Sequence, residues 1–237
     1  MNNSSARNPN RRIVVLTGAG ISAESGLRTF RAVEGLWEDH RIEDVATPEG
    51  YQRDRQLVHD FYNQRRAAAA AAKPNAAHLA LAEFEAAFAG EFLLVTQNVD
   101  DLHARAGSKR VLAMHGQLNR MHCDNCGQVT DAPPVCRPDM RCQHCQAGLL
   151  RPHVVWFGEM PLFMEEISAA LADCNLFIAI GTSGQVYPAA GFVRIAAAAG
   201  AHCIEANLEA SAVAAGFDEQ RLGLATEIVP QILAEIA

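Results

Sequence analysis

The sequence predicts an α/β protein, in which a parallel sheet carries helices on both faces and a small metal-binding module interrupts the chain. Three observations lead to this prediction. Short apolar segments alternate with helical segments along most of the chain, which is typical of a parallel sheet. A glycine-rich turn directly follows the first apolar segment. Four cysteines form two closely spaced pairs in a region with little periodicity.

The expected strands are short and apolar. The first, residues 13–17, is rich in β-branched side chains, which suits a strand covered on both faces. Further strands are expected at residues 92–96, 111–114, 176–180 and 202–205, with a weaker one at 226–229. Helices are expected at residues 54–72, 78–89, 164–172, 189–199 and 230–236.

Composition and charge restrict the class of protein. The 237 residues suffice for one or two domains with a real core, and 49% of them are hydrophobic. Acidic residues outnumber basic ones by 27 to 20, and there is no Lys/Arg tract, so we expect no nucleic-acid partner. No apolar run is as long as a membrane span, so we expect no membrane partner. Residues 1–11 lack the apolar stretch of a secretory signal and are expected to be a disordered leader.

Two Cys-x-x-Cys pairs predict a zinc ribbon. Cys123 and Cys126 form the first pair, Cys142 and Cys145 the second, and fifteen residues separate the pairs. Four thiolates complete a tetrahedral shell with no position for water, so the zinc is expected to be structural. This spacing disfavours the alternative of four free thiols. Other donors nearby are expected to be bystanders: Cys136, His122 and His144. Paired metal-binding cysteines favour a reducing compartment, and we expect a cytoplasmic protein.

The glycine-rich turn predicts a dinucleotide site. Residues 18–23, Gly-Ala-Gly-Ile-Ser-Ala, match the G-x-G-x-x-A form, in which backbone N–H groups approach a pyrophosphate at the start of a helix. Ser22 is expected to cap that helix. A dehydrogenase of this type would continue with a second strand and an acidic residue about twenty residues on. Residues 28–38 show no clear strand, which disfavours a plain nicotinamide dehydrogenase.

Several motifs, in this order along the chain, resemble the sirtuin family of NAD-dependent protein lysine deacylases, in its bacterial desuccinylase-like (class III) form. Besides the four cysteines, they lie at residues 18–22, 29–31, 96–100, 114–116, 151–159, 181–183 and 207–209. The resemblance implies a Rossmann-like large domain and a small zinc-ribbon and helical domain, with NAD and an acyl-lysine peptide meeting in the cleft between them. The large domain would comprise residues 12–30, 76–119 and 151–237. The small one would comprise the insertions 31–75 and 120–150.

The resemblance also implies the reaction. The acyl-lysine amide oxygen attacks C1′ of the nicotinamide ribose and nicotinamide leaves; the enzyme must hold this poor nucleophile in line. A base then removes a proton from a ribose hydroxyl, which attacks the imidate carbon. NAD is consumed, and lysine, nicotinamide and O-acyl-ADP-ribose are the products. His115 matches the base and Asn98 would orient the ribose. A lone histidine is more often structural, but histidine has a suitable pKa and His115 ends an expected strand.

The resemblance assigns most NAD contacts to residues that follow strands. Asp100 would bind the nicotinamide carboxamide, Phe30 would shield the reactive ribose, and Arg31 would order the cofactor loop. The alternatives are that Asp100 or Asp101 caps a helix and that Arg31 is merely solvated. The residues expected to bind NAD are Gly18, Ala19, Gly20, Ile21, Phe30, Arg31, Gln97, Asn98, Val99, Asp100, Gly181, Thr182, Ser183, Asn207, Leu208, Glu209 and Ala225.

Tyr62 and Arg65 bear on the acyl group. They stand at i and i+3, hence on one helix face, and the sirtuins that remove succinyl and malonyl groups carry a Tyr-x-x-Arg pair at this place. Arg65 would bind the distal carboxylate bidentately while the Tyr62 hydroxyl donates to it. Arg66 is also within reach, so the register stays open, and a solvated helix face is the plainer alternative. The tunnel for acyl-lysine and the pairing with the peptide backbone are assigned to Val154, Val155 and Phe157.

We therefore expect a monomeric deacylase whose partners are acyl-lysine proteins or peptides. Other functions stay open: a plain deacetylase of the same family, a non-catalytic module that binds NAD or ADP-ribose, or a docking protein built around the zinc ribbon. A zinc hydrolase would need an open metal position, which four cysteines do not leave.

Overall fold

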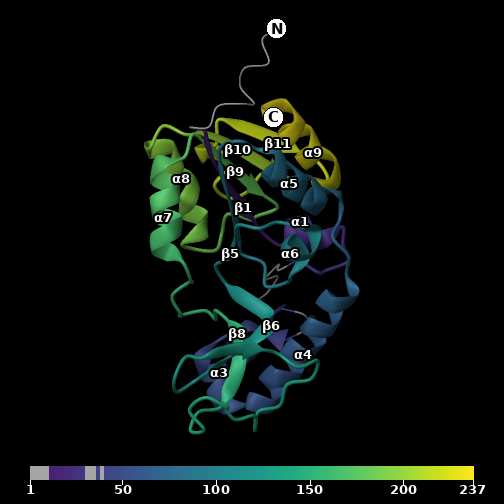
Figure 1. Ribbon diagram of the computed structural model, residues 1–237, viewed down its shortest axis with the longest axis vertical. Coiled ribbons are helices and arrows are strands. Elements are labelled where there is room, and N and C mark those ends of the chain that lie inside the picture. Colours follow the sequence, from purple (N-terminus) through teal and green to yellow (C-terminus); the bar gives the residue numbers. More distant parts are fainter. Residues whose placement is uncertain (1–10, 30–35, 38–39) are drawn as a thin grey trace.

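The computed structural model describes residues 11–29, 36–37 and 40–237. Phe30, Arg31 and all of the expected leader except Arg11 lie outside the described residues. The described chain forms a larger part and a smaller part along the long axis of the molecule (Figure 1). Among these residues, no helix has both the length and the apolar character needed to span a bilayer.

A six-stranded sheet forms the centre of the larger part, in the order β11-β10-β9-β1-β4-β5 (Figure 1). Its strands are β1 (Arg12–Thr17), β4 (Glu91–Thr96), β5 (Val111–Ala113), β9 (Leu176–Ile180), β10 (His202–Asn207) and β11 (Glu219–Leu222). All neighbouring pairs are parallel, as the alternation of strands and helices predicts. Thr17 pairs with both Thr96 and Ile180, so the turns after β1, β4 and β9 lie at one edge of the sheet.

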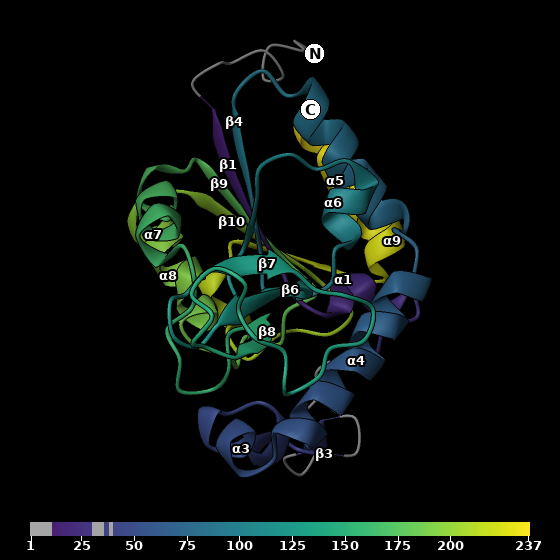
Figure 2. The same ribbon diagram turned by 60° about the horizontal axis from the view of Figure 1, so that its bottom comes forward.

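Helices cover both faces of this sheet (Figure 2). One face carries α1 (Gly20–Ala23), α5 (Ala76–Ala87), α6 (Leu102–Ala106) and α9 (Ala225–Ile236). The other carries α7 (Met164–Asp173), a 3-10 turn (Ala189–Gly191) and α8 (Phe192–Ala198), and a second 3-10 turn (Ala214–Gly216) precedes β11. Two apolar clusters result: Leu81 and Ile232 belong to the first, Leu171 and Phe192 to the second.

The last expected strand is wrong. Residues 226–229 belong to helix α9, because apolar side chains recur at Val229, Ile232 and Leu233 and bury one face of a helix that accommodates Pro230. The edge strand is instead β11, whose residues Glu219–Leu222 are mostly polar and alternate between half-buried and exposed. Edge strands need no continuous apolar run, and for that reason this segment carried no strand signal.

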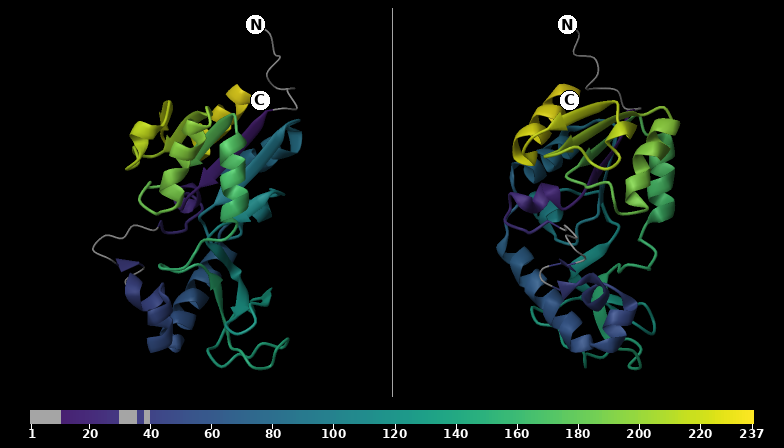
Figure 3. Two further views of the ribbon diagram at one scale, coloured as in Figure 1. Left: turned by 90° about the vertical axis from the view of Figure 1, so that its left-hand side faces the viewer. Right: turned by 180° about the vertical axis from the view of Figure 1, so that it is seen from behind.

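The smaller part combines a helical segment with an antiparallel sheet, and Figure 3 shows it at one end of the molecule from two further sides. The helical segment contains β2 (Leu36–Trp37), β3 (His40–Arg41), α2 (Ile42–Val45), α3 (Pro48–Arg53) and α4 (Arg55–Ala71). Asp54 starts α4 by accepting a hydrogen bond from Leu57 N over 2.9 Å, and the alanine run prolongs it.

The three-stranded sheet has the order β7-β6-β8, with β6 (Gly116–Cys123), β7 (Val129–Asp131) and β8 (Leu150–Val154). It therefore begins before residue 120 and ends after residue 150. Strand β6 begins at Gly116, three positions after β5 ends at Ala113. The chain therefore passes directly from the six-stranded sheet to the three-stranded one. The functional cleft is expected at this junction.

Candidate functional site

A cavity of about 1170 Å³ extends from the carboxyl ends of the parallel strands into the smaller part. This is where open α/β sheets place their ligands. The larger part contributes residues that follow β1, β4, β5, β9 and β10, and the smaller part contributes α4 and the segment after β8. The cavity thus brings together residues that the sequence assigned to NAD and residues that it assigned to the acyl group.

The turns after β1 and β9 meet through glycines. Gly18 N donates to Ile180 O over 2.9 Å, and Gly20 N donates to Gly181 O over 2.8 Å. A Cβ on Gly20 would stand 2.6 Å from Gly181 Cα, and one on Gly18 would stand 2.7 Å from Gly181 O. The turns therefore present bare backbone to the cavity, which is the surface a pyrophosphate can approach. Beside them the cavity is lined by Ala19, Thr182 and Ser183.

One residue expected at this turn does not reach the cavity. Ile21 is fully buried and packs in the apolar cluster beneath helix α1, because it occupies the inward face of that short helix. Its side chain therefore does not line the cavity, and the expectation that Ile21 binds NAD stays a prediction. Phe30 and Arg31 lie outside the described residues, so their assigned roles remain expectations.

Asn98, Ser22 and Asp100 form a polar network on the cavity wall. Asn98 Nδ2 donates to Gly18 O over 3.1 Å and to Ser22 Oγ over 3.2 Å. Ser22 Oγ in turn donates to Asp100 Oδ2 over 3.1 Å. Ser22 does not cap a helix as expected; it lies within α1, and its hydroxyl links α1 to the segment after β4 instead. Burial raises the pKa of Asp100, although hydrogen bonds from Leu102 N and Ser22 partly oppose this.

Behind this network, a buried chain of hydroxyls fixes the backbone at Asn98. Thr96 Oγ1 accepts hydrogen bonds from Asn98 N over 3.0 Å and from Thr17 Oγ1 over 2.9 Å. Thr17 Oγ1 lies 2.9 Å from His103 Nε2. Burial lowers the pKa of His103 to about 3, so this histidine is neutral and acts as a hydrogen-bonding partner without charge. Asn98 is therefore held at both its backbone and its side chain.

His115 lies where the large sheet gives way to the small one, between β5 and β6. Its Nδ1 is 3.1 Å from Gln97 O. Since a carbonyl oxygen only accepts, Nδ1 carries the proton and Nε2 keeps its lone pair. Burial lowers the pKa of His115 below its ordinary value, while the hydrogen bond to Gln97 raises it in part. The ring lines the cavity as a neutral base.

The far end of the dinucleotide half is built around Thr182. Gln97 Nε2 donates to Thr182 Oγ1 over 3.1 Å, and Asn207 Nδ2 donates to Thr182 O over 2.7 Å. These bonds tie together the ends of β4, β9 and β10. The other residues expected here also line the cavity: Val99, Leu208, Glu209 and Ala225.

Helix α4 turns Tyr62 and Arg65 toward the cavity and Arg66 away from it. Tyr62 and Arg65 both line the cavity, and Tyr62 is fully buried. Arg66 Nε instead donates to Leu118 O over 2.7 Å, and its Nη1 donates to Asn63 Oδ1 over 2.8 Å. The register that the sequence left open is therefore the one that presents Arg65.

The segment after β8 closes the same end of the cavity. Val154 is the last residue of β8 and is buried, whereas Val155 N donates to His115 O over 2.9 Å. Phe157 N donates to Ala46 O over 3.0 Å, and 44% of Phe157 is exposed. Val154, Val155 and Phe157 all line the cavity, as expected for a tunnel.

The sequence reasoning missed the side chains that hold this segment. Arg151 pairs with Glu159 over 2.7 Å, and Trp156 Nε1 donates to Tyr62 over 3.0 Å. The first contact lay within a motif already singled out. The second joins residues 94 positions apart, and no spacing rule could have found it.

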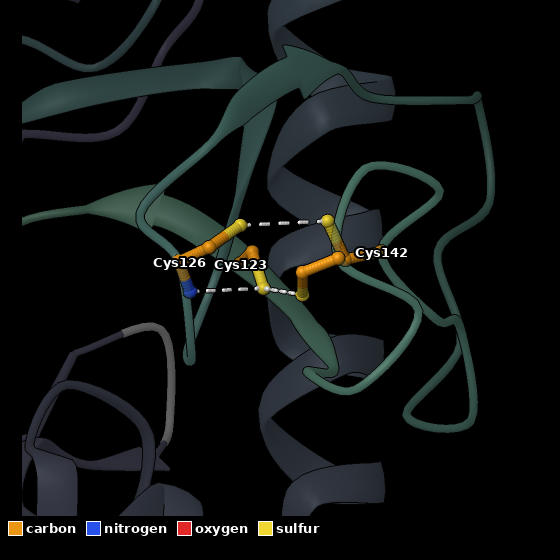
Figure 4. Close-up of side chains that lie close together, drawn as sticks. Cys123, Cys126 and Cys142 are labelled. Carbon is orange, nitrogen blue, oxygen red and sulfur yellow. Dashed lines mark hydrogen bonds between the residues drawn. The ribbon is translucent and has the colours of Figure 1, made fainter.

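The four cysteines of the two pairs converge in the smaller part. Figure 4 labels three of them, Cys123, Cys126 and Cys142. Cys123 Sγ lies 3.6 Å from Cys145 Sγ, and Cys126 Sγ lies 3.8 Å from Cys142 Sγ. A tetrahedron with zinc–sulfur bonds of about 2.3 Å has sulfur atoms about 3.8 Å apart, so the four thiolates fit one zinc ion.

Comparison with known proteins confirms the resemblance seen in the motifs. The Sir2 family model matches residues 18–188. NAD-dependent protein deacylases of Yersinia pseudotuberculosis and Escherichia coli strain K12 are 58% and 56% identical, over 94% and 95% of this chain and 81% and 82% of theirs. A solved Sir2 homologue mutant with ADP-ribose gives a TM-score of 0.88 at 35% identity, over 100% of this chain and 96% of its own. A Sir2 homologue with NAD gives 0.86 at 36%, over 95% and 89%. With its folded core, glycine turns and cysteine cluster, the chain belongs to the Sir2 family, the sirtuins.

Proposed function

We propose that this protein is an NAD-dependent protein lysine deacylase that removes acidic acyl groups, such as succinyl and malonyl, as well as acetyl. With one water consumed, it transfers the acyl group from lysine to the ADP-ribose part of NAD and releases nicotinamide and free lysine. The observation that carries the proposal is a cavity that joins the glycine turns, the neutral His115 and the Tyr62–Arg65 pair. The names of the similar deacylases and the NAD and ADP-ribose complexes of similar structures support it.

The larger part provides the seat for NAD, which supplies the sugar carbon that accepts the amide oxygen. Bare backbone at Gly18, Gly20 and Gly181 faces the pyrophosphate. Asn98 would orient the ribose and Asp100 would bind the nicotinamide carboxamide. The adenosine end would lie against Asn207, Leu208, Glu209 and Ala225, and the remaining contacts would come from Ala19, Gln97, Val99, Thr182 and Ser183, all of which line the cavity.

His115 acts as the general base through Nε2. Because Nδ1–H donates to Gln97 O, the lone pair of Nε2 is available to take the proton from a ribose hydroxyl. The lowered pKa keeps the ring neutral at physiological pH, so no deprotonation has to precede the reaction. Because the ring orientation is fixed, Nε2 needs no reorientation before it takes the proton. This matches a reaction in which the amide oxygen must also be held in line.

Arg65 and Tyr62 would receive the distal carboxylate of an acidic acyl group. Arg65 supplies a positive charge, and burying the carboxylate without such a partner would be costly. Burial raises the pKa of Tyr62, while the hydrogen bond from Trp156 partly opposes this, so the phenol stays protonated and able to donate. Val154, Val155 and Phe157 would enclose the lysine stem and pair with the extended peptide.

Zinc bound by Cys123, Cys126, Cys142 and Cys145 would stabilise the small sheet. Four thiolates leave no coordination position for water or substrate, so the ion has a structural role. The seven cysteines form no disulfide bond, in keeping with a cytoplasmic enzyme. We infer that it acts as a monomer on acyl-lysine proteins; light scattering after size exclusion measures this directly.

The acyl preference is tested by kcat/KM on succinyl-lysine and acetyl-lysine peptides. We expect Tyr62→Phe and Arg65→Met each to lower desuccinylation by roughly tenfold or more, the value of a charge-assisted hydrogen bond, with a smaller effect on deacetylation. Arg55→Met on the same helix is the matched control, because Arg55 does not line the cavity. Desuccinylation that survives both changes undiminished means that the pocket takes a plain acetyl group. Mass spectrometry of the products separates turnover from mere binding of NAD.

A further inference from the structure

Trp156 determines that the Tyr62 hydroxyl accepts a hydrogen bond on one side. Tyr62 is fully buried, Trp156 is 2% exposed, and Trp156 Nε1 lies 3.0 Å from the Tyr62 oxygen. An indole N–H can donate but cannot accept. The Tyr62 oxygen must therefore accept this hydrogen bond, and its own hydrogen is left for a different partner.

The indole itself is held in place from behind. Arg151 donates twice to the Glu159 carboxylate, over 2.7 and 2.9 Å, and Glu159 Oε2 also accepts from Trp156 N over 2.8 Å. The Arg151 guanidinium lies over the indole ring, with Cζ 3.4 Å from the ring centroid. The ion pair thus fixes both the backbone and the ring of Trp156, so the indole has little freedom to turn away from Tyr62.

Tyr62 belongs to the residues that border the cavity, although its side chain is fully buried. Tyr62, Arg65 and Trp156 all line it. Within the described part of the chain, the hydrogen bond from Trp156 is the one that the Tyr62 hydroxyl makes. A ligand carboxylate can accept the remaining hydrogen, whereas the methyl group of an acetyl cannot.

We propose that Trp156 is a positioning residue for acidic acyl groups, holding the Tyr62 hydroxyl so that its hydrogen points at the distal carboxylate beside Arg65. This inference rests on the proposed acyl preference and adds the residue that pre-organises the donor. An unfixed phenol would have to be oriented during binding, and fixing it beforehand removes that part of the binding cost.

Trp156→Phe keeps an aromatic ring and removes the N–H donor. We expect the ratio of kcat/KM for succinyl-lysine over acetyl-lysine peptides to fall by roughly fivefold to tenfold, the effect of one hydrogen bond, mainly through a higher KM for the succinyl peptide. The double variant with Tyr62→Phe should be no more impaired in this ratio than Tyr62→Phe alone, because both act through one hydroxyl. Tyr51→Phe is the matched control: Tyr51 packs against the same indole, but its buried hydroxyl has no partner among the described residues.

Nitrogen-15 spectra test the contact even where Trp156→Phe folds poorly. The chain has two tryptophans, and Trp37→Phe assigns their indole signals. In the otherwise unchanged protein, the Trp156 indole N–H should resist solvent exchange, lose that protection in Tyr62→Phe, and shift more with a succinyl-lysine peptide than with an acetyl-lysine peptide. Any one of three results overturns the inference. The first is a Trp156 indole signal that Tyr62→Phe does not change. The others are additive effects in the double variant and an unchanged substrate ratio in folded Trp156→Phe. If Tyr62→Phe and Arg65→Met themselves leave desuccinylation intact, the acyl assignment fails instead.

Discussion

The two ends of the cavity differ in the kind of atoms that form their surface. At the dinucleotide end, backbone atoms of Gly18, Gly20 and Gly181 form the surface, and their shape depends on missing side chains. At the acyl end, side chains form the surface, and Tyr62 is held by Trp156. Changes at the first end should therefore weaken NAD binding, whereas changes at the second should alter which acyl group is accepted.

Removing the zinc should have the largest effect, because the ion would hold the three-stranded sheet of the smaller part together. Structural zinc supplies about 10–16 kcal/mol of apparent binding free energy in small domains. We expect Cys142→Ser, or chelation of the wild type, to remove about one zinc per chain, expose residues 120–150 to proteolysis, and abolish deacylation through unfolding. Zinc content, proteolysis and activity measure this together.

Cys136→Ser is the matched control for the zinc site. Cys136 is buried in the same part, but it lies outside the group of four converging sulfurs, so its substitution should leave the zinc content intact. A chelated protein that keeps full activity and an intact small sheet would contradict a structural zinc.

His115→Ala changes the residue that lies between the dinucleotide end and the acyl end of the cavity. Loss of a general base costs about 100-fold to 10,000-fold in kcat, and we expect a loss of this size with NAD binding retained. Because the pKa of His115 is lowered, this histidine should stay neutral to a lower pH than an ordinary histidine does. The acid limb of the wild-type kcat profile should therefore have its midpoint below pH 6.5. Product analysis measures kcat and its pH profile, and calorimetry measures NAD binding. Unimpaired turnover in this variant would be incompatible with His115 as the base.

Gly20→Ala should have the smallest of the three effects, and it acts at the dinucleotide end alone. The new Cβ would stand 2.6 Å from Gly181 Cα, so the two turns must separate. We expect at least a tenfold rise in the KM for NAD with the succinyl-to-acetyl ratio unchanged, measured by steady-state kinetics. Gly191→Ala is the control, since its Cβ would meet its nearest neighbour at 3.8 Å. A normal KM in Gly20→Ala would show that this contact does not shape the site.

Much of the larger part could be predicted because its strands are buried on both faces. Strands β1, β4 and β9 are continuous apolar runs, and the glycine turn follows directly from the first. Edge strand β11 could not be found, since its polar alternation resembles that of an exposed turn. The β-branched start of α9 was mistaken for a strand because tertiary packing overrides local propensity there.

The candidate site divides in the same way. The spacing of the four cysteines sufficed to predict that they lie together, because each pair is a local turn. Spacing could not choose between Arg65 and Arg66; the choice depends on Leu118 O, which satisfies Arg66 from a distant strand. The hydrogen bond from Trp156 to Tyr62 is likewise a product of tertiary packing and leaves no local pattern.

The contact between Gly20 and Gly181 has a consequence for how this sequence can change. The two residues are 161 positions apart in the chain, yet each leaves the other no room for a methyl group. Since glycine is already the smallest residue, a mutation at either position has no compensating replacement at the other. Any change in ligand preference at this end, whether natural or engineered, must therefore come from side chains elsewhere on the cavity wall, such as Glu209, while both glycines are retained.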